Sequence, residues 1–535
     1  QPMRNRLLET TGLPGHPVAP GAAGEPLRSH AATGLIQRVE CLRHSVSEQS
    51  DAAHRSTMGQ FMTPAAVAEF MVSLFDARGR HLRILDPGAG IGCLSAGLVA
   101  TLCTRSRRPE SIALTAYEAD RALIGPLTET LDACRTACED AGIEFTGKVC
   151  AEDFIEAGSE LAGVGLFERQ GCRQFDCVVM NPPYRKIQSD SNERRLLRRL
   201  GVETSNLYAG FVAIALKLLA DGVELVAITP RSFCNGPYFK PFRKLLLTSA
   251  ALRRLHVFDS RSRAFADDQV LQENVIFKAI RGAVPGKLTV SMSRGPGERN
   301  LASRRIDPAM LVVPGDPNFV IHLAPERGDA DIASRVQRLP ARLEDLGISV
   351  STGRVVDFRA DQYLRRDPAD GTAPLIYPAH FEGGFIRWPI PDGRKPNAIV
   401  DAVGTQGLLI PSAIHVLVKR FSSKEERRRI VAAIYDPRRL EATVVGFENH
   451  INYYHANGRG LPMVLAKGLA AYLNSTLVDS YFRQFSGHTQ VNAADLRMLR
   501  YPAREVLHEI GHRVGDRFPE QAVLDRLVES HLECA

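Results

Sequence analysis

The sequence lacks the patterns that mark a membrane protein, a secreted protein or a cysteine-based metal site. No apolar run in the 535 residues approaches the ~20 residues that span a bilayer. The first residues do not show the basic-then-apolar order of a signal peptide. The ten cysteines include no C-x-x-C pair, and Cys134 and Cys138, one helical turn apart, have no matching His or Cys cluster. We therefore expect a cytoplasmic protein without membrane contact or metal, whose cysteines are buried and reduced.

The chain also lacks a strong excess of charge and any internal repeat. Its 67 Lys and Arg residues against 60 Asp and Glu residues give a net charge of +7. This modest excess permits a polyanionic partner without requiring one. A hydrophobic fraction of 44% and a charged fraction of 24% are ordinary for a globular protein. A chain of this length predicts two or more domains.

Composition divides the chain into three parts. Residues 1–50 form an N-terminal arm, which is rich in Gly, Pro and Ala up to about residue 33 and therefore partly flexible; a helix is plausible from residue 35. Residues 51–325 are expected to form a first domain that ends in a polar connector, 293–317. Residues 326–535 are expected to form a second domain of mixed α+β type.

The first domain alternates between strand and helix patterns. Strands are predicted at 82–86, 111–118, 145–150, 175–180, 223–230, 252–258, 273–280 and 286–293. Helical patterns between them predict an α/β fold with a doubly wound, mostly parallel sheet. The last two strands are expected to form a terminal antiparallel hairpin, because the link between them, RGAVPG, is too short to cross over.

Three further helices are predicted from sequence periodicity. One follows GQFMTP, with Thr63 as its cap and Pro64 at its first position. In the second domain, 422–436 is expected to be one helix, because Ser423 and Glu426 have the spacing of a capping box. The apolar periodicity of 466–485 predicts another.

Acidic residues follow three successive strands of the first domain. LDPGAGIG, residues 85–92, places Asp86 at a strand end before a glycine turn, where it suits a ligand with an ammonium group. Glu118 follows the next strand and could accept hydrogen bonds from a ribose diol. Asp153 and Phe154 follow the third, and could bind and stack an adenine. Taken alone, the glycine segment could be a generic tight turn and each acid a solvated surface residue. Taken together, the three motifs favour a nucleoside site.

The motif NPPY, residues 181–184, follows the fourth strand. As a simple turn it would be unremarkable in composition, because Asn and Pro are common turn residues. However, Asn181 and Pro182 offer two carbonyl oxygens that can accept both hydrogens of a planar exocyclic amine. Pro183 stiffens the loop, and Tyr184 offers a ring face to a base. These four residues are the predicted catalytic set.

The motifs GQFMTP, LDPGAGIG, YEAD, AEDF and NPPY occur in an order that resembles the gamma-class adenine-N6 DNA methyltransferases of restriction–modification systems. The segments ITPRSFCNGPYFKPFR and VLQENVIF are similar to the PstI-type branch. The resemblance covers roughly residues 56–282, and a looser one covers 468–499. It implies the class I methyltransferase fold for 51–325, as the catalytic domain, and a DNA target-recognition domain for 326–535.

The resemblance also implies S-adenosylmethionine as cofactor and double-stranded DNA as substrate. The residues implied to bind the cofactor are Phe61, Thr63, Pro64, Asp86, Pro87, Gly88, Gly90, Glu118, Ala119, Asp153 and Phe154. Phe265 falls where the family places a second aromatic ring against the target base. The target adenine must be flipped out of the duplex to reach the pocket.

The candidate residues for DNA contact lie outside the catalytic motifs. Arg185 and Lys186 begin a basic run, 185–200, that is either a solvated helix face or a phosphate-binding surface. His488 and Gln490 could meet base edges, or could belong to an ordered polar loop. No acid-acid-x-lysine constellation marks a nuclease, so a cognate restriction endonuclease would be a separate chain.

Three alternative functions remain open. A cytosine-N4 methyltransferase presents the same kind of exocyclic amine to NPPY. An RNA or protein-glutamine methyltransferase could also use this motif, although the ~200 residues of the second domain suit DNA reading better. The third alternative is a non-catalytic nucleic-acid-binding protein, which the intact strand-end acids disfavour.

Overall fold

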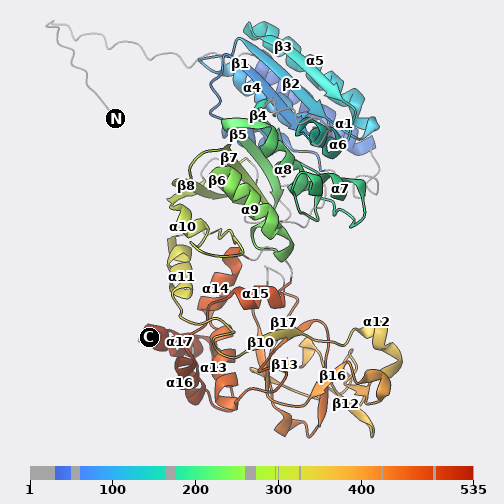
Figure 1. Cartoon of the computed structure of the whole chain (residues 1–535), viewed down its shortest axis with the longest axis vertical. Coiled ribbons are helices and arrows are strands. Elements are labelled where there is room, and N and C mark those ends of the chain that lie inside the picture. Colours follow the sequence, from blue (N-terminus) through green and yellow to red (C-terminus); the bar gives the residue numbers. More distant parts are fainter. Residues whose placement is uncertain are drawn as a thin grey trace, which may run out of the picture.

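The protein is described by a computed structural model that covers 30–49, 59, 61–163, 175–258, 273–293, 295, 297–298, 301–323, 327–422, 426–485 and 490–533. Figure 1 shows two regions, one above the other. The N-terminal region (30–323) contains one large sheet, and the C-terminal region (327–533) contains two smaller ones. None of the helices in the described ranges is both long and apolar enough to cross a membrane.

The N-terminal region is built on a nine-stranded mixed sheet. Its strands are β1 (His81–Pro87), β2 (Ser111–Tyr117), β3 (Glu144–Cys150), β4 (Phe175–Met180), β5 (Leu219–Pro230), β6 (Ala250–Phe258), β7 (Asn274–Arg281), β8 (Leu288–Ser293) and β9 (Ala302–Ile306). The order is β3-β2-β1-β4-β5-β7-β6-β8-β9, and the first five strands are parallel. The predicted doubly wound α/β fold and its eight strands are confirmed.

The antiparallel end of the sheet has different partners from those predicted. β7 pairs with β5 and β6, while β8 lies on the far side of β6, so β7 and β8 do not form a hairpin with each other. β7 and β8 still run antiparallel to each other on either side of β6. The short link between them suffices, because it spans only two strand spacings, ~10 Å, which six residues can reach. β8 instead pairs antiparallel with β9, which lies inside the segment expected to be a connector.

Helices cover both faces of this sheet, as Figure 1 shows. One face packs against α1 (His30–Gln49), α3 (Ala65–Ser73), α4 (Cys93–Thr104) and α5 (Arg121–Ala141). The other packs against α6 (Phe154–Leu161), α8 (Leu207–Leu218) and α9 (Lys240–Ser249). Neighbouring strand residues alternate between the two cores, for example Ile84 in the first and Leu85 in the second. α1 begins inside the segment assigned above to the N-terminal arm.

Thr63 does not cap α3. The helix begins at Ala65 with Pro64 in the N-cap position, one residue later than predicted. Pro64 makes no side-chain cap hydrogen bond, and the Ala65 amide donates to Glu40 Oε2 at 3.1 Å. Thr63 is buried instead, and its hydroxyl oxygen accepts a hydrogen bond from Asn181. The tertiary partner outweighs the local one, so the threonine serves the site rather than the helix.

Two sheets and a helical bundle form the C-terminal region, confirming the mixed α+β prediction. The six-stranded sheet has the order β10-β20-β17-β18-β14-β13 and the five-stranded sheet has the order β11-β15-β12-β19-β16. Their strands are β10 (Ser349–Thr352), β11 (Leu364–Arg365), β12 (Thr372–Ile376), β13 (Phe381–Glu382), β14 (Phe385–Ile386), β15 (Ala398–Val400), β16 (Leu409–Pro411), β17 (His415–Lys419), β18 (Ala432–Tyr435), β19 (Val444–Phe447) and β20 (Ile451–His455). The helices of this region are α11 (Arg327–Gln337), the short α12 (Asp357–Ala360), α13 (Met463–Leu473), α14 (Thr476–Phe485), α15 (Ala493–Met498), α16 (Arg504–Arg513) and α17 (Gln521–Glu533). The short α10 (Pro308–Leu311) belongs to the N-terminal region, whose core includes Leu311.

One helix prediction in this region is wrong, and the other is confirmed except for a break. Within 422–436, residues 426–431 are irregular and Ala432–Tyr435 form β18, a fully buried strand between β17 and β14. Its continuous apolar run fits burial on both faces, which periodicity cannot separate from a helix. The second helix is broken into α13 and α14, because the Asn474 side chain leaves the helix and hydrogen-bonds both backbone groups of Ala432.

The prediction of reduced thiols is confirmed for the described cysteines. All eight are free, and seven of them are buried, with Cys41 the exposed one. Cys103 and Cys138 approach to 3.9 Å between sulfur atoms, which is a contact and not a bond.

Candidate active site

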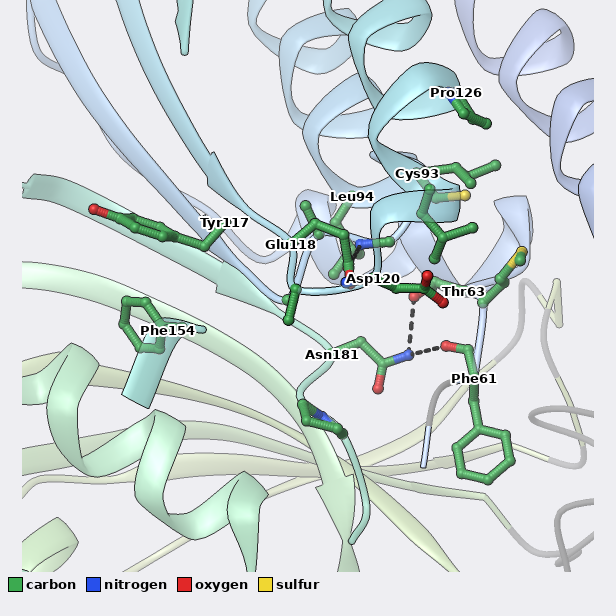
Figure 2. A pocket seen from close by; sticks show the side chains of 18 of the residues that line it. Phe61, Thr63, Cys93, Leu94, Tyr117, Glu118, Asp120, Pro126, Phe154 and Asn181 are labelled. Carbon is green, nitrogen blue, oxygen red and sulfur yellow. Dashed lines mark hydrogen bonds between the residues drawn. The ribbon is translucent and has the colours of Figure 1, made fainter. Parts of the chain in front are cut away.

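A cavity of about 480 Å³ opens at the carboxyl ends of β1 to β4. This is the edge at which ligands bind in doubly wound sheets. Its lining includes the predicted residues Phe61, Thr63, Gly88, Gly90, Glu118, Ala119, Asp153, Phe154, Asn181 and Arg185. Figure 2 shows the side chains of these strand ends converging on one space. Five motifs that lie far apart in the sequence therefore form one site.

The glycine turn after β1 forms one wall of the cavity. Gly88 and Gly90 have positive φ angles of 72° and 59°, which side chains rarely adopt. A methyl group added at Gly90 would meet no heavy atom within 4 Å, so it would extend into open space. The Gly90 amide donates to Glu118 Oε2 at 2.8 Å, which fixes the turn against the end of β2.

Asp86 and Pro87 lie behind this turn, outside the residues that line the cavity. Asp86 is fully buried; its Oδ2 accepts a hydrogen bond of 2.6 Å from the Ser95 hydroxyl, whereas Oδ1 has no hydrogen-bond partner among the described residues. Burial raises the pKa of this carboxyl to about 7, and the nearby Glu118 carboxylate adds to the effect. A buried oxygen without a donor is a feature that a cationic ligand would satisfy.

Glu118 and Asp153 bring two more carboxylates to the cavity. The two Glu118 oxygens accept from the Gly90 and Asp120 amides, each at 2.8 Å, and burial raises the pKa of Glu118. Because each carboxylate oxygen can accept a second hydrogen bond, Glu118 keeps capacity for a hydroxyl donor. Asp153 caps α6 by accepting from Ile155 at 2.7 Å, so one of its oxygens is occupied by the helix.

Aromatic rings line the cavity beside Asp153. The Phe154 ring lies 5.4 Å from the Tyr117 ring and 5.1 Å from the Phe211 ring, measured between centroids. Both Tyr117 and Phe154 are labelled in Figure 2, on the side of the cavity away from Asn181. This arrangement forms an apolar compartment suited to a flat base, at one end of a site whose other end is polar.

Asn181 has a defined orientation. Its Nδ2 group donates to the Phe61 carbonyl at 2.8 Å and to the Thr63 hydroxyl oxygen at 3.1 Å, shown by the dashed lines in Figure 2. Both amide hydrogens are therefore used, and Oδ1 points away from them. The segment GQFMTP, predicted to close over the cofactor, thus also sets the direction of the predicted catalytic carbonyl.

The rest of NPPY is fixed by the same segment. The Tyr184 amide donates to the Gly59 carbonyl at 3.0 Å, and its ring packs against Phe61 at 5.4 Å between centroids. The Tyr184 ring also meets the edge of Tyr208 at 6.3 Å. Pro183 lines the cavity, whereas Pro182 and Tyr184 do not. The tyrosine is half-buried beside the cavity rather than inside it.

Removing the Thr63 hydroxyl should slow the reaction without unfolding the protein. In Thr63→Val the Asn181 amide loses one of its two partners and is held by the Phe61 carbonyl alone, so its orientation is less restrained. We expect kcat to fall ~10-fold, at the low end of the cost of losing one positioning contact. Steady-state kinetics would measure this, with Thr63→Ser, which keeps the hydroxyl, expected to stay within about twofold of the parent. Equal losses in both variants would contradict the role of the hydroxyl.

The structure leaves some predicted residues unplaced. Phe265 and His488 lie outside the described ranges. Lys186 is exposed, and Arg185 makes an ion pair with Glu193 at 3.5 Å. Gln490 is half-buried in the C-terminal region, where it pairs through its backbone with Phe421.

Sequence reasoning missed several lining residues. They are Val46, Gln49, Met62, Ile91, Leu94, Tyr117, Asp120, Leu207 and Phe211, among others. Most of these are apolar residues, and their sequence signal is the same as that of any core position. Val46 and Gln49 were missed because α1 precedes every motif. Asp120, two residues after Glu118, could have been found from the motif itself.

The fold and the cavity define a class I S-adenosylmethionine-dependent methyltransferase. The family model for the Eco57I restriction-modification methylase matches residues 128–265. The chain is 42% identical over 502 residues to the type II methyltransferase M.PstI of Providencia stuartii, covering 92% of this chain and 97% of the relative. It is also 42% identical to the type II methyltransferase M.BsuBI of Bacillus subtilis, over 94% of this chain and 98% of that one. The chain belongs to this family of type II methyltransferases of restriction–modification systems.

Among solved structures, the type IIL restriction-modification enzyme MmeI in complex with DNA has a similar fold. The TM-score is 0.54 at 10% sequence identity, over 94% of this chain and 75% of that one. At this identity the similarity concerns the fold alone. It extends beyond the nine-stranded sheet into the C-terminal region, since it covers nearly the whole chain.

Proposed function

We propose that this methyltransferase transfers the methyl group of S-adenosylmethionine to N6 of an adenine flipped out of double-stranded DNA. The observation that carries the proposal is the orientation of Asn181. Because its NH₂ group is held by Phe61 and Thr63, its carbonyl oxygen is the group left to meet an exocyclic amine. That arrangement suits an amine as acceptor of the methyl group.

The residues around the cavity fit S-adenosylmethionine. Asp86, buried behind the glycine turn with no donor to its Oδ1 among the described residues, would act on the ammonium group from behind the cavity wall. Glu118 would accept from the ribose hydroxyls, and Phe154 would pack on the adenine ring while Asp153 accepts from its amine. The open space at Gly90 would admit the ligand close to the backbone. When bound, S-adenosylmethionine supplies a methyl group on a positively charged sulfur.

The chain's own contribution is to hold and polarise the target amine. The adenine amine is a weak nucleophile, because its lone pair is delocalised into the ring. Hydrogen bonds from N6–H to Asn181 Oδ1 and to the Pro182 carbonyl would return electron density to the nitrogen. Positioning and electrostatic stabilisation then supply the acceleration, and no covalent intermediate with the enzyme is needed.

The Tyr184 ring is proposed to stack on the flipped base. Stacking offsets part of the few kcal/mol that unstacking costs. We expect Tyr184→Phe to change activity by less than about threefold and Tyr184→Ala to weaken catalysis by ~10-fold or more, since base–aromatic stacking is worth ~1–3 kcal/mol. Fluorescence of a 2-aminopurine at the target position would report flipping directly. A phenylalanine variant as impaired as the alanine variant would show that the hydroxyl, not the ring, matters.

DNA contact is proposed to spread over both regions. Next to NPPY, Lys186, Arg195 and Arg199 are exposed and make no ion pair with described residues, so they suit phosphate contact. Base reading is assigned to the C-terminal region, residues 326–535, with Gln490 and His488 as candidates. The enzyme would act in the cytoplasm, and any cognate restriction endonuclease would be a separate chain.

Labelled S-adenosylmethionine offered to DNA, RNA and protein tests the proposal. We expect label in DNA alone, and nucleoside mass spectrometry should identify N6-methyladenine. N4-methylcytosine in its place would overturn the base assignment while leaving the DNA methyltransferase intact. Label in RNA or protein would overturn the substrate class.

A further inference from the structure

A buried arginine links the two regions of the molecule. Arg231 directly follows β5, at the start of the 3₁₀ helix η1 (Arg231–Cys234), and is 4% exposed. Its Nη2 donates to the backbone carbonyls of Arg483, at 3.2 Å, and of Gln484. These carbonyls belong to the last turn of α14, in the C-terminal region. Figure 1 places α14 on the side of that region that faces the N-terminal region.

The charge of Arg231 is balanced from the N-terminal region. Its Nη1 donates to Glu273 Oε2 at 2.9 Å, and Glu273 is 4% exposed. The backbone strengthens the pair, since the Arg231 amide donates to the Glu273 carbonyl at 2.7 Å. A planar guanidinium is suited to this task, because its fixed fork can reach a carboxylate and two carbonyls at once. A cation at the C-terminal end of α14 also favours the helix dipole.

A buried ion pair of this kind is a poor source of stability. Desolvation of both charges offsets most of their attraction, so apolar side chains of similar size would hold the regions together as well. The pair instead specifies how η1 and α14 are oriented, because the guanidinium satisfies its partners in only one arrangement of the two. Two backbone hydrogen bonds accompany it: Leu323 donates to the Gln484 carbonyl at 3.2 Å and Ile321 to the Cys234 carbonyl at 2.8 Å.

η1 also touches the proposed base-stacking tyrosine through one intermediate ring. The Ser232 and Tyr208 hydroxyl oxygens lie 2.9 Å apart, so one hydrogen-bonds to the other. The Tyr208 ring meets Tyr184 edge-on at 6.3 Å and is stacked by Phe239 at 5.5 Å. A continuous series of contacts therefore runs from the end of α14 through Arg231, Ser232 and Tyr208 to Tyr184. The same C-terminal end of α14, which Arg231 contacts, lies five residues before Gln490 in the sequence.

We propose that Arg231 is a positioning residue that couples the seating of the C-terminal region on DNA to the placement of Tyr184. The inference rests on the proposed function, since it presumes that the C-terminal region reads DNA and that Tyr184 stacks the target base. When the C-terminal region binds its correct DNA site, the position of α14 is fixed. Arg231 transmits that position to η1, and η1 in turn fixes the positions of Tyr208 and Tyr184. Off-target DNA seats α14 differently and leaves the ring misplaced, which lowers the rate at that site.

The test measures methylation of genomic DNA free of adenine methylation, mapped site by site. In Arg231→Met we expect kcat at the preferred site to fall ~10- to 100-fold, the range for a small misplacement at a reacting centre, with the Kd of S-adenosylmethionine unchanged. The preference for that site over sites differing by one base pair should shrink. Arg105→Met is the matched control, since Arg105 also donates to two backbone carbonyls, Phe75 and Ala77, but within the N-terminal region. It should keep the parent's site preference.

A double variant separates positioning from mere charge balance. In Arg231→Met with Glu273→Gln, no uncompensated carboxylate is left, so the thermal midpoint should recover while kcat and site preference stay low. Recovery of activity together with the midpoint would overturn the proposal, as would a parent-like kcat in Arg231→Met. If Arg231→Met does not fold, Arg231→Lys, which can satisfy fewer partners, should show a smaller loss of the same kind, and full activity in it would overturn the proposal. A parent enzyme that methylates no adenine would instead overturn the proposed function.

Discussion

Replacing Asn181 with alanine is expected to lower the rate of methyl transfer by ~100-fold or more, comparable to the loss of one preorganised polar group in other active sites. The variant removes the carbonyl that the structure directs away from Phe61 and Thr63. It removes little that binds the cofactor, so the Kd of S-adenosylmethionine should change by less than about threefold. Single-turnover kinetics on DNA, with calorimetry for the cofactor, would measure the two effects separately.

The comparison with Thr63→Val sharpens this result. If Asn181 acts through its oxygen and Thr63 acts only by orienting the amide, the double variant Asn181→Ala with Thr63→Val should be no slower than Asn181→Ala alone. Additive losses would mean that Thr63 has a role of its own. A rate in Asn181→Ala within about tenfold of the parent would exclude the amide as the polarising group.

Glu118→Ala is the second change with a large expected effect. The carboxylate braces Gly90 and Asp120 and is placed to accept from a ribose diol, so its loss should weaken cofactor binding by ~1.5–3 kcal/mol, the range for hydrogen bonds to a charged group. Calorimetry with S-adenosylmethionine would measure it. Glu129→Ala is the control, because it removes an exposed carboxylate from α5 at no cost to the cavity.

The outcome for Glu118 also depends on folding. Because the carboxylate supports two backbone amides, the thermal midpoint of the variant is to be measured beside its affinity. Glu118→Gln, which keeps the shape and one accepting oxygen, should lose less affinity than Glu118→Ala. A folded Glu118→Ala with the parent's affinity would remove Glu118 from the cofactor site.

Much of the site could be predicted because it depends on backbone direction rather than on packing. Parallel strands end at the same edge, so residues that follow parallel strands, such as Glu118 after β2 and Asn181 after β4, must meet there. Thr63 was predicted for the right site with the wrong local role. Its distant partner, Asn181, replaces the helix cap that short-range spacing suggested, and short-range spacing carries no information about such a partner.

The errors in the fold arise where several pairings satisfy the same pattern. The sequence pattern predicted β7 and β8 as strands. It did not predict their order, because several neighbouring strand edges can accept the same strand. The segment that forms β18 has the apolar run of either a helix or a buried strand, and its neighbours β17 and β14 decide between them. The cavity residues of α1 and α8 could not be predicted, because apolar lining residues look like core residues.

The position of β7 has a consequence for how the chain reaches its folded state. β5 and β6 are consecutive in the order of β-strands, yet they share no hydrogen bonds, because β7 lies between them. During synthesis, β5 and β6 each keep an unpaired edge until residues 274–281 have been made. Unpaired apolar edges invite association with other chains. A ribosome-bound chain that ends before residue 274 should therefore depend on chaperones, and the catalytic pocket, although all of its described lining residues precede β7, should form only after that strand is inserted.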